Sequence, residues 1–581
     1  MASAELSSHR PHLHAHEPAE ARGSWLGRHR VPLLVTACSL PLYVVWWAAF
    51  ATGGGDLAAQ VAWAEFARMY PDSAYNLFWY GGLHTANYSV ISPYVMAAIG
   101  VVPMTLLSGL SSTWLAGALV VRSGVRKPLW PSLAVAFSLW CQVVSGRSTY
   151  MLGVALGLAA VLALAGERRR IVVAVICAAL STMGSPVAGL FLAVVGAAYL
   201  LAREWGRAAA LLVPPAAVVA LTTVLFPFEG VQPMPFARIW PPVLLCTVVL
   251  LTAPRAWRVL RFGAVVYALG VVLCYLIASP IGTNVERLTE LAAPAALLAI
   301  LIDGGSRRNG ESRGDGDRRG EEEGAPAIGP SSRWFTPRRQ RGVSFVALVL
   351  SLTWLSGKTV ADVVTNTKVP AYAVKVDGVL AELQRLGSER TRVEVVPARD
   401  HREAAILAPH VNLARGWNRQ ADVERGRLFY DGHSGTDVPK GTFSPASYRA
   451  WLSQWAVGFV VIANGQPDGP AELEHALVKS EPDYLERVWE DVNWRIYRVK
   501  NATPLVDPPA SVVSSDGASL VVGMPKPGSV TVRVAFSPWL WADDGCLTAD
   551  GEFTRLTVRK AGQIRLSSTY GGPTKGTAPE C

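Results

Sequence analysis

The chain has 581 residues, of which 51% are hydrophobic and 17% are charged. This composition is too apolar for an ordinary soluble enzyme and is typical of a protein that crosses a membrane several times. The formal net charge of +10 does not indicate nucleic-acid binding, because the Lys and Arg residues lie in short clusters between apolar runs.

The N-terminal 30 residues are polar and rich in His, and no small-residue cleavage motif ends the apolar run that follows them. We therefore predict that residues 1–30 form a disordered cytoplasmic tail and that the first apolar run is a retained membrane helix.

Apolar runs of membrane-spanning length recur from residue 31 to residue 358. A helix that crosses a bilayer needs about 20 mostly apolar residues, and fewer where neighbouring helices shield it. We predict an α-helical bundle of about eleven membrane helices, over 31–302 with a last helix at 343–358. The run at 90–121 is too long for one straight helix, so part of it should be interfacial or re-entrant. The predicted spans are 31–51, 90–121, 129–145, 149–166, 171–184, 186–202, 208–226, 239–253, 262–279, 288–302 and 343–358.

The distribution of Lys and Arg selects one orientation, because basic residues are enriched in cytoplasmic loops. Basic clusters occur in the loops at 122–128, 167–170, 203–207, 254–261 and 303–342. The alternate loops at 52–89, 146–148, 227–238 and 280–287 are nearly free of them. We predict a multi-pass protein of the cell membrane with a cytoplasmic N-terminus. The segment 303–342, rich in Gly, Arg and Glu, is predicted to be a disordered cytoplasmic linker.

Beyond residue 358 the chain becomes soluble in character. Helical and strand patterns predict an α/β domain at 359–508, and alternating apolar and polar residues between Gly-rich turns predict a small antiparallel β domain at 509–581. The topology places both domains outside the cell. A disulfide between Cys546 and Cys581 is plausible in that compartment, and two free thiols are the alternative.

Polar side chains gather in the loops that are predicted to face outward, above all in the first loop, 52–89. A carboxylate can deprotonate an acceptor hydroxyl, and a guanidinium can bind a phosphate in bidentate fashion. The pattern suits transfer of a sugar from a polyprenyl phosphate. No second catalytic acid is needed, because phosphate is already a good leaving group. The candidate residues are Asp56, Glu65, His84, Arg147, Glu229, Asn284, Glu286 and Arg287.

The order of these features resembles the GT-C superfamily of membrane glycosyltransferases: a first helix, a long outer loop opening with an Asp, many helices and an outer C-terminal domain. A closer resemblance is to a group of uncharacterised bacterial integral membrane proteins with a GT-C-like arrangement, and it covers nearly the whole chain. The segments that carry it are "SGRSTYMLGVALGLAA", "STMGSPVAGLFL", "FPFEGVQP", "SPIGTNVERL" and "SPWLWADDGCL". The resemblance implies that Asp56 is the catalytic base. Better-known members often have two acids there, whereas "GGGDLAAQ" has one.

Structural roles compete with these functional ones. Asp56 follows three glycines and could serve as the N-cap of an interfacial helix. Glu65 lies nine residues on, about half a turn out of phase, so it should not share a face with Asp56. Arg147 and Arg287 could contact lipid headgroups, and Glu286 could simply pair with an arginine.

We therefore predict an inverting glycosyltransferase that moves a sugar from a lipid-linked donor to a cell-envelope glycan or lipid at the outer leaflet. Arg147 and Arg287 would bind the phosphate, and Glu229, Asn284 and Glu286 would position substrate, with Glu65 and His84 as further contacts. No cofactor is predicted, a divalent metal being the alternative. The rival functions are transport of an envelope precursor and a non-catalytic role in envelope assembly. Transport is disfavoured because no charge lies in the middle of a predicted span and no inverted halves are visible.

Overall fold

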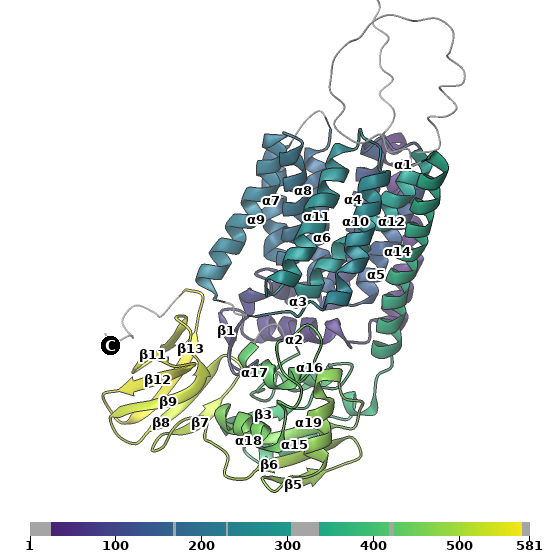
Figure 1. Cartoon of the computed structure of the whole chain (residues 1–581). Helices are drawn as coiled ribbons and strands as arrows, with labels where there is room; N and C mark the ends of the chain where they lie inside the picture. The colour runs from purple at the N-terminus through teal and green to yellow at the C-terminus, as the bar shows by residue number, and fades with distance from the viewer. Residues whose placement is uncertain (1–24, 167–169, 228–229, 304–335, 418–422, 572–581) are drawn as a thin grey trace, which may run out of the picture.

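The computed structural model describes residues 25–166, 170–227, 230–303, 336–417 and 423–571. These residues form a bundle of long helices with two smaller domains at one end, called here the domain end (Figure 1). Most of the predicted tail at 1–30, most of the predicted linker at 303–342, and Glu229 lie outside the described residues.

The bundle helices follow the predicted apolar runs closely. They are α1 (Trp25–Val45), α3 (Ser92–Ile99), α4 (Val101–Arg122), α5 (Leu129–Val144), α6 (Ser148–Leu164), α7 (Ile171–Gly184), α8 (Pro186–Leu201), α9 (Trp205–Leu225), α10 (Trp240–Thr252), α11 (Arg258–Leu276), α12 (Glu286–Asp303) and α14 (Pro337–Asn366). The long run at 90–121 is divided at Gly100, whose φ of 92° ends α3 before α4 begins.

Among the described residues, five helical segments are long and apolar enough to cross a membrane: His29–Phe50, Val101–Arg122, Trp205–Leu225, Arg258–Leu276 and Arg338–Asn366. Several further apolar helices are shorter. These helices mark the chain as a membrane protein, whereas the total of eleven crossings and their orientation stay predictions.

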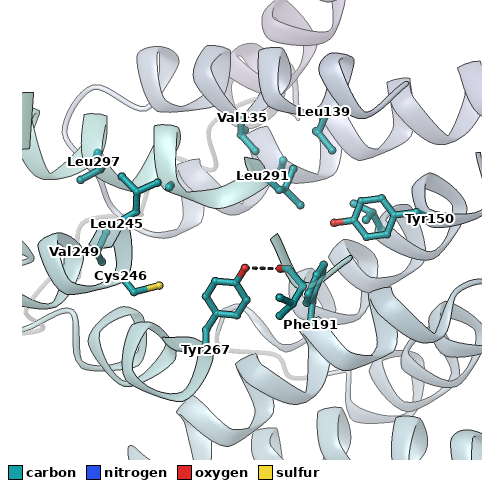
Figure 2. Close-up of a cluster of buried hydrophobic side chains, with 14 of the residues drawn as sticks. Val135, Leu139, Tyr150, Phe191, Leu245, Cys246, Val249, Tyr267, Leu291 and Leu297 are labelled. Carbon is teal, nitrogen blue, oxygen red and sulfur yellow. Dashed lines mark hydrogen bonds between the residues drawn. The ribbon is translucent and has the colours of Figure 1, made fainter. Parts of the chain in front are cut away.

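Large apolar and aromatic side chains fill the centre of the bundle (Figure 2). The rings of Tyr150 and Phe191 pack edge to face with centroids 6.0 Å apart. The Tyr267 hydroxyl donates a hydrogen bond to the Val285 carbonyl, which fixes α11 against the turn before α12. This packing holds α6, α8, α11 and α12 in one unit and so determines where the turns at the domain end lie.

The first loop contains a helix, α2 (Asp56–Met69), which lies across the domain end between the bundle and the soluble domains (Figure 1). A two-stranded sheet, β1 (Tyr75–Asn76) and β2 (Leu83–His84), follows it. Most residues of α2 are buried, on nearly all sides of the helix, so the loop is a packed layer rather than a free connection.

The α/β domain has a four-stranded sheet in the order β3-β4-β6-β5. Its strands are β3 (Arg392–Val395), β4 (Val457–Ala463), β5 (Leu485–Glu490) and β6 (Trp494–Val499), and its main helices are α15 (Asp377–Arg385), α16 (Arg402–Leu407), α18 (Pro445–Gln454) and α19 (Glu472–Lys479). Strands β3 and β4 are parallel and the other pairs antiparallel. Every residue of β4 is buried, which explains its unbroken apolar sequence.

The C-terminal domain consists of two antiparallel sheets, in the orders β10-β13-β8-β7 and β11-β12-β9. The strands are β7 (Ser511–Ser515), β8 (Ser519–Met524), β9 (Gly528–Ala535), β10 (Leu540–Ala542), β11 (Cys546–Asp550), β12 (Phe553–Val558) and β13 (Gly562–Ser568). Cys546 is disulfide-bonded. Cys581 lies outside the described residues, so the pairing of these two cysteines stays a prediction.

A buried charge cluster in the α/β domain predicts a pH-dependent stability. Arg415 binds both Glu394 and Glu474, and all three side chains are buried. Burial, reinforced by the charge of Glu474, raises the pKa of Glu394 from 4.5 to about 8 against the attraction of Arg415. Between these two values the folded state holds one proton more than the unfolded state, so stability falls as pH rises.

We expect the unfolding temperature of the purified protein to be lower at pH 8 than at pH 5, and Glu394→Gln to remove much of this difference. Thermal melts followed by intrinsic fluorescence in detergent measure it. Glu490→Gln is the matched control, because Arg495 binds Glu490 at the surface. This contact lowers the pKa of Glu490, so Glu490 does not titrate in the pH range in which Glu394 acts. An unchanged pH slope in Glu394→Gln would show that another group is responsible.

Candidate functional site

Three glycines place Asp56 at the start of α2. Gly53 and Gly55 have φ values of 84° and 62°, which other residues rarely adopt. A side chain on Gly54 would collide with the Arg402 guanidinium. The Gly55 backbone N–H donates to the Asp400 carbonyl at 2.8 Å. The glycines are therefore needed because the turn is left-handed and lies directly against the α/β domain.

Asp56 is not the N-cap that the alternative interpretation expected. Gly55 occupies that position, Asp56 is the first residue of α2, and no side-chain capping hydrogen bond is formed. The left-handed turn at Gly55 starts the helix one residue earlier than the sequence pattern suggested. The Asp56 carboxylate is consequently not used by the helix end and can act on another group.

Asp56 faces Arg287 from α12. The distance from Asp56 Oδ2 to Arg287 Nη2 is 4.0 Å, and the side chains are 36% and 15% exposed. The Arg287 guanidinium also lies 5.3 Å from the centre of the Tyr150 ring. Within the described part of the chain, neither the carboxylate nor the guanidinium forms a hydrogen bond, and the buried Tyr150 hydroxyl has no partner. This group thus retains its capacity to bind a ligand.

Arg147 lies beside this pair, in the turn between α5 and α6. Its Nη1 donates to Glu290 at 2.7 Å and to Gln142 at 2.5 Å. Arg147 and Arg287 are close enough to repel each other, and Asp56 attracts both. An anion bound between the two guanidinium groups would reduce this repulsion.

Buried acids of α12 continue the network toward α14. Lys358 Nζ lies 2.7 Å from Glu286 and also binds Glu290, while Arg238 Nη1 lies 3.6 Å from Glu286. Glu286 therefore does pair with an arginine, as the structural alternative proposed, but more closely with Lys358. Glu290, Gln142 and Lys358 were not among the predicted site residues, although Glu286 and Glu290 have the four-residue spacing of one helix face.

The charges inside α12 and α14 weaken the argument against a transporter. The predicted last span stopped at residue 358, whereas α14 continues to Asn366 and carries Lys358 and Asp362 within the helix. Glu290 likewise lies in the second turn of α12. These charges gather near the domain end, where each has a polar partner.

Glu65 and His84 lie apart from this network. Glu65 binds Arg68 at 2.5 Å on α2, and that hydrogen bond lowers the pKa of Glu65. His84 is buried between the Ala74 carbonyl and Ser537 Oγ, at 3.3 and 3.1 Å, and burial lowers its pKa to about 4. Asn284 is half-buried in the turn before α12. His84 thus joins the first loop to the β domain as a neutral side chain.

Two neighbouring cavities, together called the trough, lie along α12 from Leu288 to Ala299. A cavity of about 340 Å³ lies between α8, α10, α11 and α12, next to Leu288 and Thr289. A second cavity, of about 560 Å³, shares Leu260 and Ala296 with it and continues toward the end of the bundle opposite the soluble domains. Small side chains, mostly Ala, form much of its α12 wall. The trough can hold a long, flexible apolar chain.

The family described as "Domain of unknown function (DUF8823)" matches residues 507–545. No curated protein matches the chain. Among solved structures, the chain is similar to the arabinofuranosyltransferase AftD from Mycobacteria, with a TM-score of 0.42 and 15% identity. The alignment covers 86% of this chain and 41% of that one, so the chain spans well under half the length of that protein.

The segment that matches the domain of unknown function contacts the membrane bundle. Trp539 Nε1 donates to the Leu225 carbonyl at 2.6 Å, and the Trp539 ring stacks on Phe226 with centroids 5.1 Å apart. Ser537 binds His84. Through these contacts the segment attaches the β domain to the end of α9 and to the first loop.

Proposed function

We propose that the protein is an inverting membrane glycosyltransferase that moves a sugar from a polyprenyl-phosphate donor to a hydroxyl of a cell-envelope glycan or lipid. The observation that carries the proposal is the juxtaposition of Asp56 and Arg287, 4.0 Å apart and without hydrogen bonds in the described part of the chain. A free carboxylate and a free guanidinium are the two groups that such a transfer needs.

In the proposed reaction the acceptor oxygen attacks the anomeric carbon while the bond from that carbon to the phosphate oxygen breaks. Asp56 takes the proton of the acceptor hydroxyl, and the polyprenyl phosphate leaves with the bonding electrons. Arg287, with Arg147 nearby, stabilises the charge that grows on the departing phosphate. Glu286 and Asn284 remain candidates for positioning substrate, and no residue is assigned to protonate the leaving group.

We further propose that the domain end faces outward, with the N-terminus in the cytoplasm and both C-terminal domains outside the cell. The basic residues of the loops at the opposite end support this orientation. We also propose that no divalent metal takes part, and the comparison with and without EDTA below tests this.

The function can be tested in a strain that lacks the protein. We expect the strain to accumulate a polyprenyl-phosphate sugar and to lose one sugar from an envelope glycan or glycolipid. The purified protein in nanodiscs should transfer that sugar from the accumulated donor to the deficient acceptor, with and without EDTA. An unchanged envelope and donor pool in the deletion strain would contradict the proposal.

The trough predicts how the lipid part of the donor is bound. Ala296 lines both cavities, so Ala296→Phe would fill space needed by the isoprenoid chain. We expect KM for a long-chain donor to rise about tenfold, corresponding to the lost burial of about two methylene groups. KM for a two-isoprene analogue should stay the same. Ala217→Phe, on an exposed face of α9, is the control. Equal KM changes for both donors would argue against the trough.

A further inference from the structure

Three polar residues lie on one face of α14 at the domain end. Lys358, Asp362 and Asn366 are spaced four apart, so their side chains lie one above another along the helix. Each contacts a different part of the candidate site. Lys358 binds the acids of α12. Asp362 Oδ2 accepts a hydrogen bond from Ser145 Oγ at 2.6 Å.

The Asp362 contact reaches Asp56 through the turn between α5 and α6. Ser145 precedes Gly146, which has a φ of 73° and lies directly against the start of α2. A Cβ atom on Gly146 would be 3.0 Å from the Leu57 backbone nitrogen and 3.6 Å from the Asp56 carbonyl carbon. The turn that carries Arg147 therefore packs on the backbone that carries Asp56.

The last residue of α14, Asn366, contacts the glycine turn before Asp56. Its carbonyl accepts a hydrogen bond from Thr52 Oγ1 at 2.9 Å. Its side-chain amide packs so closely on Gly55 that a Cβ there would lie 2.4 Å from the amide nitrogen. The turn is thus held on one side by the end of a membrane helix.

Arg402 of the α/β domain holds the turn on the other side. Its Nη2 donates to Thr52 Oγ1 at 2.7 Å and to the Asn366 carbonyl at 2.6 Å, and its Nη1 donates to Asp400 at 2.6 Å. The Asp400 carbonyl accepts from the Gly55 N–H. The Arg402 side chain is 4% exposed. One buried guanidinium therefore joins the glycine turn, the end of α14 and the α/β domain.

We infer that Arg402 is a positioning residue, through which the α/β domain fixes the direction of the Asp56 carboxylate. The inference rests on the proposed function of Asp56. Three consecutive glycines, of which Gly53 and Gly55 have left-handed φ values, do not hold one conformation by themselves. The bonds to Arg402 and Asp400 supply the missing restraint. Because an error of about 1 Å in the position of a catalytic group can cost about a hundredfold in rate, the α/β domain controls the reactivity of the membrane site.

The test compares Arg402→Lys with wild type in the nanodisc transfer assay. A lysine cannot reproduce these bonds, since all donors of its ammonium lie on one nitrogen, whereas Arg402 bonds Asp400 from Nη1 and Thr52 and Asn366 from Nη2. We expect kcat to fall about tenfold or more, while KM for the donor changes less than about twofold. Thr52→Val, which removes the hydroxyl that Arg402 binds, should act in the same direction. Arg415→Lys is the matched control, because the Arg415 side chain is only 9% exposed but bonds to Glu394 and Glu474. It should leave kcat per folded molecule unchanged.

Hydrogen–deuterium exchange of residues 52–60 tests whether Arg402 restrains the glycine turn, without any assumption about activity. Exchange in this segment should rise in Arg402→Lys and in Thr52→Val, and should match wild type in Arg415→Lys. Unchanged exchange and unchanged kcat in Arg402→Lys, with Asp56→Asn inactive, would overturn the inference and leave the proposed function intact. Increased exchange in Arg402→Lys, combined with no sugar transfer by the wild-type protein, would contradict the proposed function instead. Arg402 would then restrain the turn without the reaction that this restraint was inferred to serve.

Discussion

Replacement of Asp56 by Asn is expected to lower kcat for sugar transfer by about 10²- to 10⁴-fold, the usual contribution of a general base. The amide has nearly the shape of the carboxylate but cannot take the proton of the acceptor hydroxyl. No capping hydrogen bond is lost, because the side chain makes none. We therefore expect folding and the KM for the donor to change little. Transfer rates measured in nanodiscs over a range of donor concentrations separate these quantities.

Asp72→Asn is the matched control for this substitution. Asp72 lies in the same loop, is exposed, and lies outside the network around Arg287. Its substitution should leave the rate unaltered. Full activity of Asp56→Asn, or full rescue of a deletion strain by Asp56→Ala, would exclude Asp56 as the base. In that case the 4.0 Å contact with Arg287 would be a structural ion pair.

The positions of the membrane helices were predictable because charged residues, Gly or Pro stand at the ends of most of the apolar runs. The run at 186–202 illustrates this. Pro186 favours the first position of a helix, and Ser185 caps it by accepting a hydrogen bond from the Ala188 N–H. The end of α14 was not predictable in this way. Lys358 interrupts the hydropathy, yet the helix continues, because Glu286 and Glu290 neutralise the lysine.

The candidate site was only partly predictable. Asp56, Arg147 and Arg287 were selected as polar residues on one side of the membrane, and the bundle brings them together. The sequence could not show that Arg147 is already engaged by Glu290 and Gln142, because these contacts join helices that are distant in the chain. The burial of His84 against Ser537 depends in the same way on where the β domain attaches.

The short sequence at residues 53–56 shows the same limit on a smaller scale. Three glycines before an acid fit a capping motif, and local pattern alone favours Asp56 as the cap. The contacts of Gly54 with Arg402 and of Gly55 with Asn366 decide otherwise. The two partners, one at the end of α14 and one in the α/β domain, lie more than 300 residues later in the chain, so they are outside the reach of any local rule.

Substitution of Arg287 should have the second-largest effect on transfer. The phosphate of the donor carries one negative charge while it is esterified to the sugar, and it gains a second when the bond to the anomeric carbon breaks. A cation beside the phosphate therefore stabilises the transition state more than it stabilises the bound donor. We expect Arg287→Gln to lower kcat by about 10²- to 10³-fold, with a smaller rise in donor KM. Arg287→Lys should retain part of the rate, since it keeps the charge but loses the bidentate geometry.

Arg68→Gln is the control, because Arg68 is exposed on α2 and bound to Glu65. Arg147 and Arg287 differ in how many of their donors are already used. Arg147 already donates to two neighbours, whereas the contacts of Arg287 with described residues are the Asp56 carboxylate at 4.0 Å and the face of the Tyr150 ring. A phosphate gains more from the guanidinium whose donors are free. Arg147→Lys should therefore destabilise the fold more than Arg287→Lys does but slow the folded enzyme less. The reverse order, measured by thermal melts and by kcat per folded molecule, would transfer the phosphate-binding role to Arg147.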